Sequence, residues 1–316
     1  MPTSLPPRSG QQYSLHHGDY AAVVTEIGAT LRRLTYQGDD VIVPWDSNEA
    51  APCCNGQLLV PFPNRIEDGE YAFDGSTYEL PIDEHERRNA IHGYGYRSYW
   101  TLEGLEEDRV TLWWRVPDML GYPFDLVVTA EYQLADDGLH LHVSATNRGG
   151  RRAPWALAIH PWLANGLEGY GDEIDRLNAR CRVTIPADTH VTVNERLLPT
   201  GTEPVDGTKY DLREGRLLTQ QPYDDAWTDV HHAGDGTVAA RFERPDGRVV
   251  SVGGDESITS FQMCTGTGFP ESRHPCGVAI EPQTAYANAF NTGKDLIVIE
   301  PGEGVSTVLF IRVEQQ

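Results

Sequence analysis

Residues 61–93, PFPNRIEDGEYAFDGSTYELPIDEHERRNAIHG, contain the clearest indication of how this chain folds. Two short strand-like runs, residues 71–73 and 77–80, flank the pair Asp74-Gly75. An Asp-Gly pair readily adopts the positive φ angles that a two-residue β-hairpin turn requires. The stretch therefore predicts an antiparallel hairpin.

The rest of the chain repeats this pattern of strand-like runs separated by turn residues. No long segment keeps the 3.6-residue apolar period of an amphipathic helix, and no repeat or low-complexity linker divides the chain. We therefore predict an all-β fold, a single large antiparallel β-sandwich domain over residues 1–316 with few short helices. The further pairs of runs are residues 124–134 and 139–147 around Asp136-Asp137-Gly138, 238–244 and 248–252 around Pro245-Asp246-Gly247, and 295–300 and 305–313 around Pro301-Gly302.

The charge of the chain argues against a nucleic-acid partner. Its formal net charge is −22, and its only lysines are Lys209 and Lys294. Phosphate backbones are bound by clustered Lys and Arg side chains, which this composition does not favour. No segment has the length and apolar character of a signal peptide or a membrane span, so we expect no membrane association.

The cysteines indicate a reducing compartment. There are five of them, and two are the neighbours Cys53 and Cys54, which are poorly placed to form a bridge with each other. No disulfide framework is visible, so we expect a cytoplasmic protein. No Cys/His spacing resembles a zinc site, and we expect neither a metal nor another cofactor. We expect a monomer or a homodimer.

Alternation along residues 151–162 and 276–284 separates bulky from small side chains. The bulky sets are Trp155, Leu157 and Ile159 in the first run, and Val278 and Ile280 in the second. The small sets are Ala156 and Ala158, followed by His160, and Gly277 and Ala279, followed by Glu281. A proline follows each titratable residue, so we expect both strands to end there. We infer a concave sheet face, kept open by Ala and Gly, with His160 and Glu281 at its floor.

A carboxylate and an imidazole that face one cavity suit general base and general acid chemistry. At neutral pH an ordinary Glu is ionised, and a His near carboxylates can stay protonated. The open face and the many aromatic residues favour a sugar-sized ligand, whose hydroxyl groups need polar partners. The candidate partners are Arg65, Asn64, His92, Asp224 and Gln262.

Each of these residues also has a purely structural interpretation. Arg65 could simply pair with a carboxylate such as Asp68. Isolated histidines are often structural, which applies to His92 and His160. The remaining alternatives are a solvated strand end for Glu281, a turn or cap for Asp224-Asp225, and a half-buried strand position for Gln262.

Taken together, these segments resemble the aldose 1-epimerase (galactose mutarotase) family, in an order and spacing that run almost from end to end. The resemblance lies in GATLRRL (residues 28–34), the block that opens with PFPNRIEDGEYAFDGSTYELP and its later NAIHG, IHPWL (159–163), LPTG and VDGTKYDLR within 198–213, YDDAW (223–227), FQMCTG (261–266) and EPQTAYANAFN (281–291).

The resemblance implies a large β-sandwich and the cofactor-free interconversion of α and β anomers of a free hexose such as galactose or glucose. By position, Glu281 matches the general base of the family, which takes the proton of the C1 hydroxyl. His160 matches the general acid, which protonates the ring oxygen. The positions that hold the sugar hydroxyls are matched by His92, Arg65, Asn64, Asp224 and Gln262.

Two departures bear on the preferred sugar. Trp162 follows the His-Pro pair with a ring of different size, and Cys264 replaces the usual tyrosine after Gln262. One alternative is a hexose-6-phosphate 1-epimerase, for which Arg87, Arg88 and Arg97 would have to form a phosphate cradle. Another is a non-catalytic sugar-binding or sensing protein on the same fold, although binding alone does not require an acid and a base.

Overall fold

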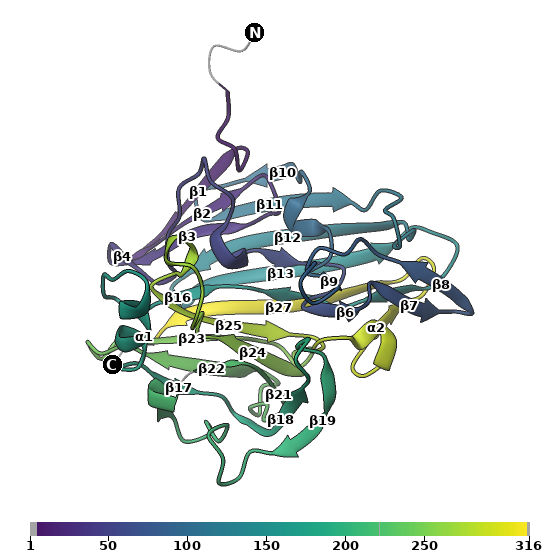
Figure 1. Cartoon of the computed structure of the whole chain (residues 1–316). Coiled ribbons are helices and arrows are strands. Elements are labelled where there is room, and N and C mark those ends of the chain that lie inside the picture. Colours follow the sequence, from purple (N-terminus) through teal and green to yellow (C-terminus); the bar gives the residue numbers. More distant parts are fainter. Residues whose placement is uncertain (1–4, 221, 315–316) are drawn as a thin grey trace.

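The computed structural model describes residues 5–220 and 222–314 of the chain (Figure 1). Within these residues, antiparallel strands form a nine-stranded, an eight-stranded and a four-stranded sheet, together with three two-stranded sheets. The predicted all-β fold with few short helices is confirmed.

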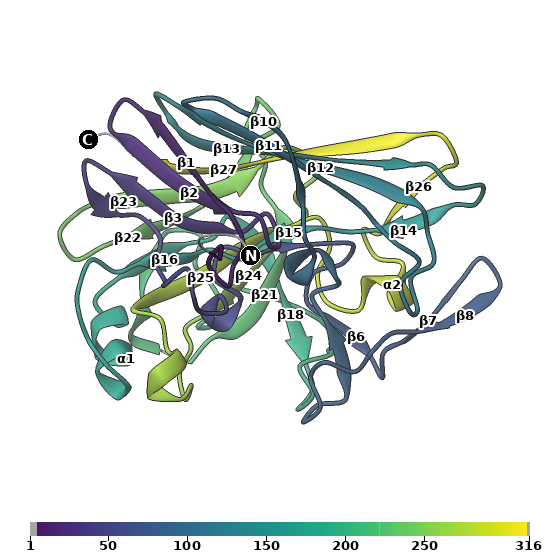
Figure 2. The same cartoon turned by 90° about the horizontal axis from the view of Figure 1, so that it is seen from above.

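The nine-stranded sheet forms one side of the molecule (Figure 2). Its longest strands lie at the centre, where consecutive and distant segments pair in register. In spatial order its strands are β10 (Thr101–Leu105), β11 (Arg109–Arg115), β12 (Leu126–Ala135), β13 (Gly138–Asn147), β27 (Gly304–Val313), β23 (Val249–Gly254), β22 (Val238–Glu243), β17 (Arg182–Thr184) and β20 (Arg216–Leu217).

The eight-stranded sheet runs through the middle of the molecule in Figure 2. Strand β23 of the first sheet contacts strand β25 of this one, which brings the two sheets together. Its strands in spatial order are β19 (Pro199–Pro204), β18 (Ala187–Val193), β21 (Asp224–Val230), β24 (Ser260–Cys264), β25 (Gly277–Gln283), β15 (Ala158–Ile159) and β5 (Leu58–Leu59), with β16 (Trp162–Ala164) also paired to β25.

Smaller elements complete the fold. The four-stranded sheet contacts β11 and β12 of the large sheet, and the hairpin β7–β8 projects on the side opposite to that sheet (Figure 2). These elements are β1 (Gln12–His17), β2 (Tyr20–Thr25), β3 (Leu31–Tyr36), β4 (Asp39–Asp40), β6 (Arg65–Glu67) with β9 (Asn89–Ile91), β7 (Glu70–Phe73) with β8 (Ser76–Glu79), β14 (Ala153–Trp155) with β26 (Ile297–Ile299), the helices α1 (Asp172–Asn178) and α2 (Ala289–Thr292), and the 3-10 turns Pro52–Cys54, Gly95–Arg97, Leu218–Gln220 and Glu271–Arg273.

Strands β24 and β25 are buried on both faces, which is unusual for an antiparallel pair. On one face Phe261, Met263 and Ile280 join the main hydrophobic core. Gln262 and Glu281, which are directly paired, occupy the other face. Because neither residue is exposed, that second face must be covered by the loops that surround it. It forms the floor of the cavity described below.

The predicted hairpins are confirmed, with one difference in pairing. Asp74 and Gly75 have φ angles of 49° and 76°, as the turn between β7 and β8 requires. The runs 124–134 and 139–147 form β12 and β13, and 238–244 and 248–252 form β22 and β23. The last two runs form β26 and β27, which do not pair with each other because β26 pairs with β14.

The predicted core faces of the two key strands are confirmed, but only one of their predicted ends is, since β15 ends at Ile159, directly before His160-Pro161. Residues 151–162 are divided between β14, β15 and the start of β16 instead of forming one strand. Pro282 does not end β25, because it pairs with Phe261 and the strand continues to Gln283. The side chains that were predicted to share the core face, Trp155, Leu157, Ile159, Val278 and Ile280, all lie in the main core.

The break between β15 and β16 explains why Pro282 is tolerated. On that edge of β25, the N–H of Ile280 donates to the Pro161 carbonyl, and that of Thr284 donates to the Leu157 carbonyl. The nitrogen of Pro282 lies between them and faces the segment where β15 has ended and β16 has not begun. A missing N–H therefore costs no ladder hydrogen bond at this position.

A methyl group at Gly277 would test the close packing of β16 on β25. A Cβ atom there would lie 2.1 Å from the carbonyl oxygen of Leu163, so a strand must shift to accept it. We expect Gly277→Ala to lower the free energy of unfolding by about 2 kcal/mol in urea titration. Gly104→Ala is the matched control, because a Cβ on that strand residue meets no atom within 4 Å. Equal stabilities of the two variants would contradict this account.

Candidate active site

All seven residues that the sequence predicted as site residues line one cavity of about 200 Å³. They come from segments far apart in the chain. The strand pairings around β25 bring the residues of the central sheet together. The pairing of β6 with β9 and a hydrogen bond from Asn64 to Gln262 add the residues of segment 61–93. The seven are Asn64, Arg65, His92, His160, Asp224, Gln262 and Glu281. Lining residues that the sequence did not single out for this purpose are Cys53, Cys54, Ile91, Trp162, Cys264 and Phe269.

His160 and Glu281 meet at the floor of the cavity. Nε2 of His160 lies 3.3 Å from Oε1 of Glu281. Only 7% of His160 and 2% of Glu281 is exposed, so Glu281 is not a solvated strand end. The second atoms of both groups, Nδ1 of His160 and Oε2 of Glu281, have no hydrogen-bond partner among the described residues. A buried acid and base are thus in contact with few other polar groups.

Burial favours the neutral form of both groups. It lowers the pKa of His160 to about 4. It also raises the pKa of Glu281 well above its usual value, with a further contribution from the charge of Asp224. This differs from the expected ionised Glu and protonated His, because that expectation assumed ordinary solvation. Burial therefore favours a neutral His160 beside a protonated Glu281.

Arg65 is held by a carboxylate that the sequence analysis did not identify. Its Nε and Nη2 donate to the two carboxylate oxygens of Glu84 at 2.9 and 3.0 Å. Burial works to raise the pKa of Glu84, but the hydrogen bonds from Arg65 hold it below its ordinary value. Asp68, the partner considered from the sequence, instead pairs with Arg196 at 2.8 Å. Glu84 lies in the charged run 83–88, and its distance in sequence from Arg65 hid the pairing.

A chain of side-chain hydrogen bonds connects Asn64, directly before β6, to Gln262 and Asp224 in the eight-stranded sheet. Nδ2 of Asn64 donates to Oε1 of Gln262 at 3.1 Å, and Nε2 of Gln262 donates to Oδ1 of Asp224 at 2.8 Å. Asp224 begins strand β21, so it is neither a turn nor a cap residue, and Gln262 is fully buried. Burial raises the pKa of Asp224. The chain fixes the orientation of all three side chains toward the cavity.

The backbone around His92 determines which of its nitrogens carries hydrogen. Its φ angle is 64°, and that of Asn64 is 55°, so both residues adopt the left-handed conformation. The backbone N–H of Asn64 donates to Nδ1 of His92 at 3.1 Å. Burial, with smaller contributions from His160, Arg65 and Arg97, lowers the pKa of His92 well below its usual value. A neutral His92 therefore carries its proton on Nε2 and is a hydrogen-bond donor.

Aromatic and thiol side chains form the less polar wall of the cavity. Trp162 is fully buried, and its Nε1 donates to the carbonyl of Cys53 at 2.9 Å. The ring of Phe269, which is 37% exposed, lies with its centre 6.2 Å from that of Trp162. Cys264, the departure noted in the sequence, is buried beside them. This wall offers apolar surface to one face of a ligand.

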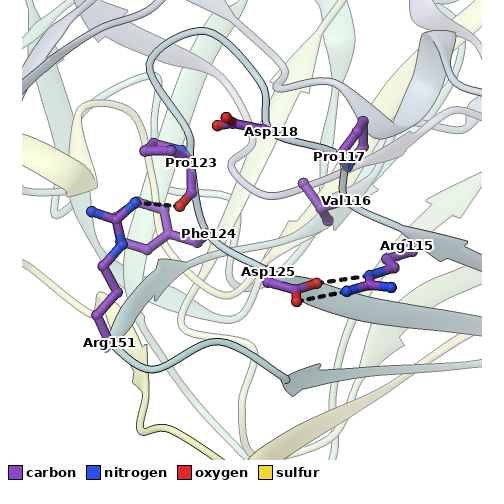
Figure 3. A pocket seen from close by; sticks show the side chains of 8 residues that line it. All are labelled: Arg115, Val116, Pro117, Asp118, Pro123, Phe124, Asp125 and Arg151. Atoms are coloured by element: carbon purple, nitrogen blue, oxygen red, sulfur yellow. Dashed lines mark hydrogen bonds and ion pairs between the residues drawn. The ribbon is translucent and has the colours of Figure 1, made fainter.

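A larger hollow of about 530 Å³ lies elsewhere on the molecule and lacks these features (Figure 3). Its Arg115 pairs with Asp125 through two hydrogen bonds. Its Arg151 lies over the ring of Phe124 at 4.9 Å and donates to the Pro123 carbonyl. Of the charged groups that Figure 3 shows, Arg115 and Asp125 pair with each other, and no histidine meets a carboxylate there as His160 meets Glu281.

The described part of the chain contains neither a metal-binding cluster nor a membrane-spanning helix. No group of three or more His, Cys, Asp or Glu side chains there is arranged to hold a metal ion. The helices in residues 5–220 and 222–314 are too short and too polar to cross a membrane. All five cysteines are free thiols.

Comparison with known proteins agrees with the resemblance seen in the sequence. The sequence model of the family described as aldose 1-epimerase matches residues 11–311. The uncharacterized protein YihR of Escherichia coli is 32% identical over 296 residues, which cover 93% of this chain and 91% of that protein. Galactose mutarotase of Sus scrofa is 30% identical over 277 residues, which cover 78% of this chain and 75% of that protein.

The fold is also similar to that of solved structures. The structure of the GalM/aldose epimerase homologue from C. elegans aligns with a TM-score of 0.83 at 21% identity, over 96% of this chain and 99% of that one. At 21% identity this likeness shows the fold alone. Membership of the family is shown by the match of the family model over residues 11–311. The protein is therefore an isomerase that belongs to the aldose 1-epimerase family.

Proposed function

We propose that the protein is a mutarotase that interconverts the α and β anomers of a free hexose such as galactose or glucose. The observation that carries the proposal is the contact of His160 with Glu281 at the floor of a small polar cavity. A general acid and a general base must both lie within reach of the reacting oxygens, and one cavity provides both.

In the proposed reaction, Glu281 takes the proton of the C1 hydroxyl while His160 donates a proton to the ring oxygen. The C1–O5 bond breaks, C1 becomes the aldehyde carbon, and the C1–C2 bond rotates. Reclosure with the two roles reversed yields the other anomer. Ring opening leaves Glu281 protonated and His160 neutral, which is the arrangement that burial favours. The cavity thereby stabilises the open-chain stage relative to the ionised pair.

The remaining polar residues fit the hydroxyl groups of a sugar. Each terminal nitrogen of Arg65 keeps an N–H beyond its bonds to Glu84 and Asn64. His92 supplies a further donor, and Asp224 an acceptor. Donors and acceptors in fixed positions are what oriented hydroxyl binding requires.

The arginines near the site favour a free sugar over a hexose 6-phosphate. Arg87 pairs with Glu84 at 3.0 Å, Arg97 with Asp83 at 2.8 Å, and Arg88 lies 3.7 Å from Asp68. None of the three is among the residues that line the cavity. A phosphate cradle would need unpaired cationic groups at its wall.

Replacement of the proposed base separates catalysis from binding. We expect Glu281→Gln to lower kcat by about 10³-fold or more, because general base catalysis is lost while the shape of the side chain is kept. Polarimetry with fresh α-galactose measures turnover, and calorimetry measures sugar binding, which should persist. Glu79→Gln, on the exposed hairpin strand β8, is the matched control. Turnover close to that of the unchanged protein in Glu281→Gln would overturn the assignment.

The pH dependence of kcat/KM should form a bell. Activity needs one proton on the pair, so uptake of a second proton by His160 gives an acidic limb near pH 4. Loss of the shared proton gives the basic limb, which lies above the range of an ordinary carboxyl group because burial raises the pKa of Glu281. In His160→Asn the acidic limb should disappear along with most activity. A profile without a basic limb would contradict a one-proton pair.

A panel of sugars tests the substrate class. We expect acceleration of anomer exchange for free galactose and glucose, and much weaker acceleration for the 6-phosphates, because the net charge is −22 and the nearby arginines are paired. Anomer exchange can be followed by NMR against the spontaneous rate. Preference for a 6-phosphate would overturn the free-sugar proposal, and binding without acceleration would indicate a sensing protein.

A further inference from the structure

Buried polar atoms without partners are concentrated directly behind Glu281. Among the described residues, both amide atoms of Gln283 and Oγ of Ser260 have no hydrogen bond of normal geometry, and the same is true of Oε2 of Glu281. Gln283 and Ser260 are both 0% exposed. Unpaired buried polar groups are costly, and natural proteins rarely keep several in one place without a role.

The strand register places these groups side by side on one face of the sheet. Glu281 and Gln283 are two residues apart on β25, so their side chains point to the same face. Gln262 pairs directly with Glu281, and Ser260 pairs directly with Gln283 on β24. Side chains of directly paired residues also share a face. Ser260 and Gln283 therefore lie next to Gln262 and Glu281 on the same face of the sheet.

When Glu281 is ionised, as its role as a base requires, the donors and acceptors in this row match in only one direction. An ionised carboxylate can only accept, so the amide must turn its Nε2 toward Glu281. Oε1 of Gln283 then faces Ser260, whose hydroxyl is free to donate. Every unpaired atom of the row obtains a partner in this arrangement. Burial raises the pKa of Glu281, and the nearby amide of Gln283 lowers it, which is the effect expected of a donor close to this carboxyl.

We propose that Ser260 and Gln283 form a hydrogen-bonded chain that positions the Glu281 carboxylate, with Oγ of Ser260 donating to Oε1 of Gln283 and Nε2 of Gln283 donating to Oε2 of Glu281. This inference rests on the proposed function for its catalytic meaning. Oε1 of Glu281, which faces His160, is then left for the C1 hydroxyl of the sugar. Gln283 is a positioning residue, because it acts on the substrate only through Glu281.

Other groups that face Glu281 contribute to its titration and must stay in place for the test. Asp224 raises the pKa of Glu281 and Arg65 lowers it, while His160 lies in contact. His160 in turn lowers the pKa of His92, and Glu281 raises the pKa of the Cys54 and Cys264 thiols. Substitutions at Gln283 and Ser260 leave all of these unchanged, so a shift reports the chain itself.

The test is Gln283→Met, which keeps approximate size and removes both polar atoms. Removal of a donor from the carboxylate should raise the titration midpoint of Glu281 by about one to two pH units. Infrared difference spectra between each protein and its Glu281→Gln counterpart isolate the carboxyl band of Glu281 and measure that midpoint without turnover. In kcat/KM, the basic limb should move upward by the same amount while the acidic limb stays.

Gln12→Met, the same replacement in the four-stranded sheet, is the matched control and should leave the midpoint unchanged. Ser260→Ala should shift the midpoint in the same direction by less, and it serves as the second variant if Gln283→Met does not fold. An unchanged infrared midpoint in a folded Gln283→Met protein would overturn the proposal, whatever its activity. If the midpoint shifts in Gln283→Met but the unchanged protein has no mutarotase activity, the hydrogen-bonded chain is supported and the proposed function is overturned.

Discussion

The burial of His160 and Glu281 against each other is the constraint on which the site depends. Each group loses its charged form more readily in the protein interior than in water, so neither is stable there as an isolated ion. If the pair holds one proton, as the proposed reaction requires, the two arrangements of that proton have the same net charge. Ala279, on the same face as Glu281, packs with Trp162 and Cys264, which line the cavity beside the pair. The surroundings that bury the pair thus also form the wall of the cavity.

In the proposed function, three of the sugar-binding residues come from a different part of the fold than the reactive pair. The segment 61–93 supplies Asn64, Arg65 and His92, with Glu84 holding the guanidinium in place. Its hairpin β7–β8 projects away from the large sheet (Figure 2). The reactive pair belongs to the central sheet, whose strands are rigidly packed on both faces. Rigid strands maintain the short separation that proton transfer requires, and connecting segments can vary the ligand.

Much of the strand pattern could be predicted from the sequence, because alternation and turn chemistry are local. The family resemblance indicated seven residues that the structure gathers around one cavity. The errors have non-local causes. Pro282 stays within β25 because the partner strand is interrupted opposite its nitrogen. Arg65 pairs with Glu84 instead of Asp68 because the antiparallel pairing of β6 with β9 brings the segment around residue 84 to it. Local patterns contain no information on either partner.

The sequence by itself determined the antiparallel β class, the core faces of β15 and β25, and a resemblance specific enough to indicate which residues gather around one ligand. Only the tertiary structure decided the protonation of the site, since the pKa of His160 and of Glu281 depends on how completely surrounding segments exclude water. It also revealed Ser260 and Gln283 behind Glu281, because their alignment arises from the register between two strands. Register and burial are properties of the assembled sheet, and no single segment contains them.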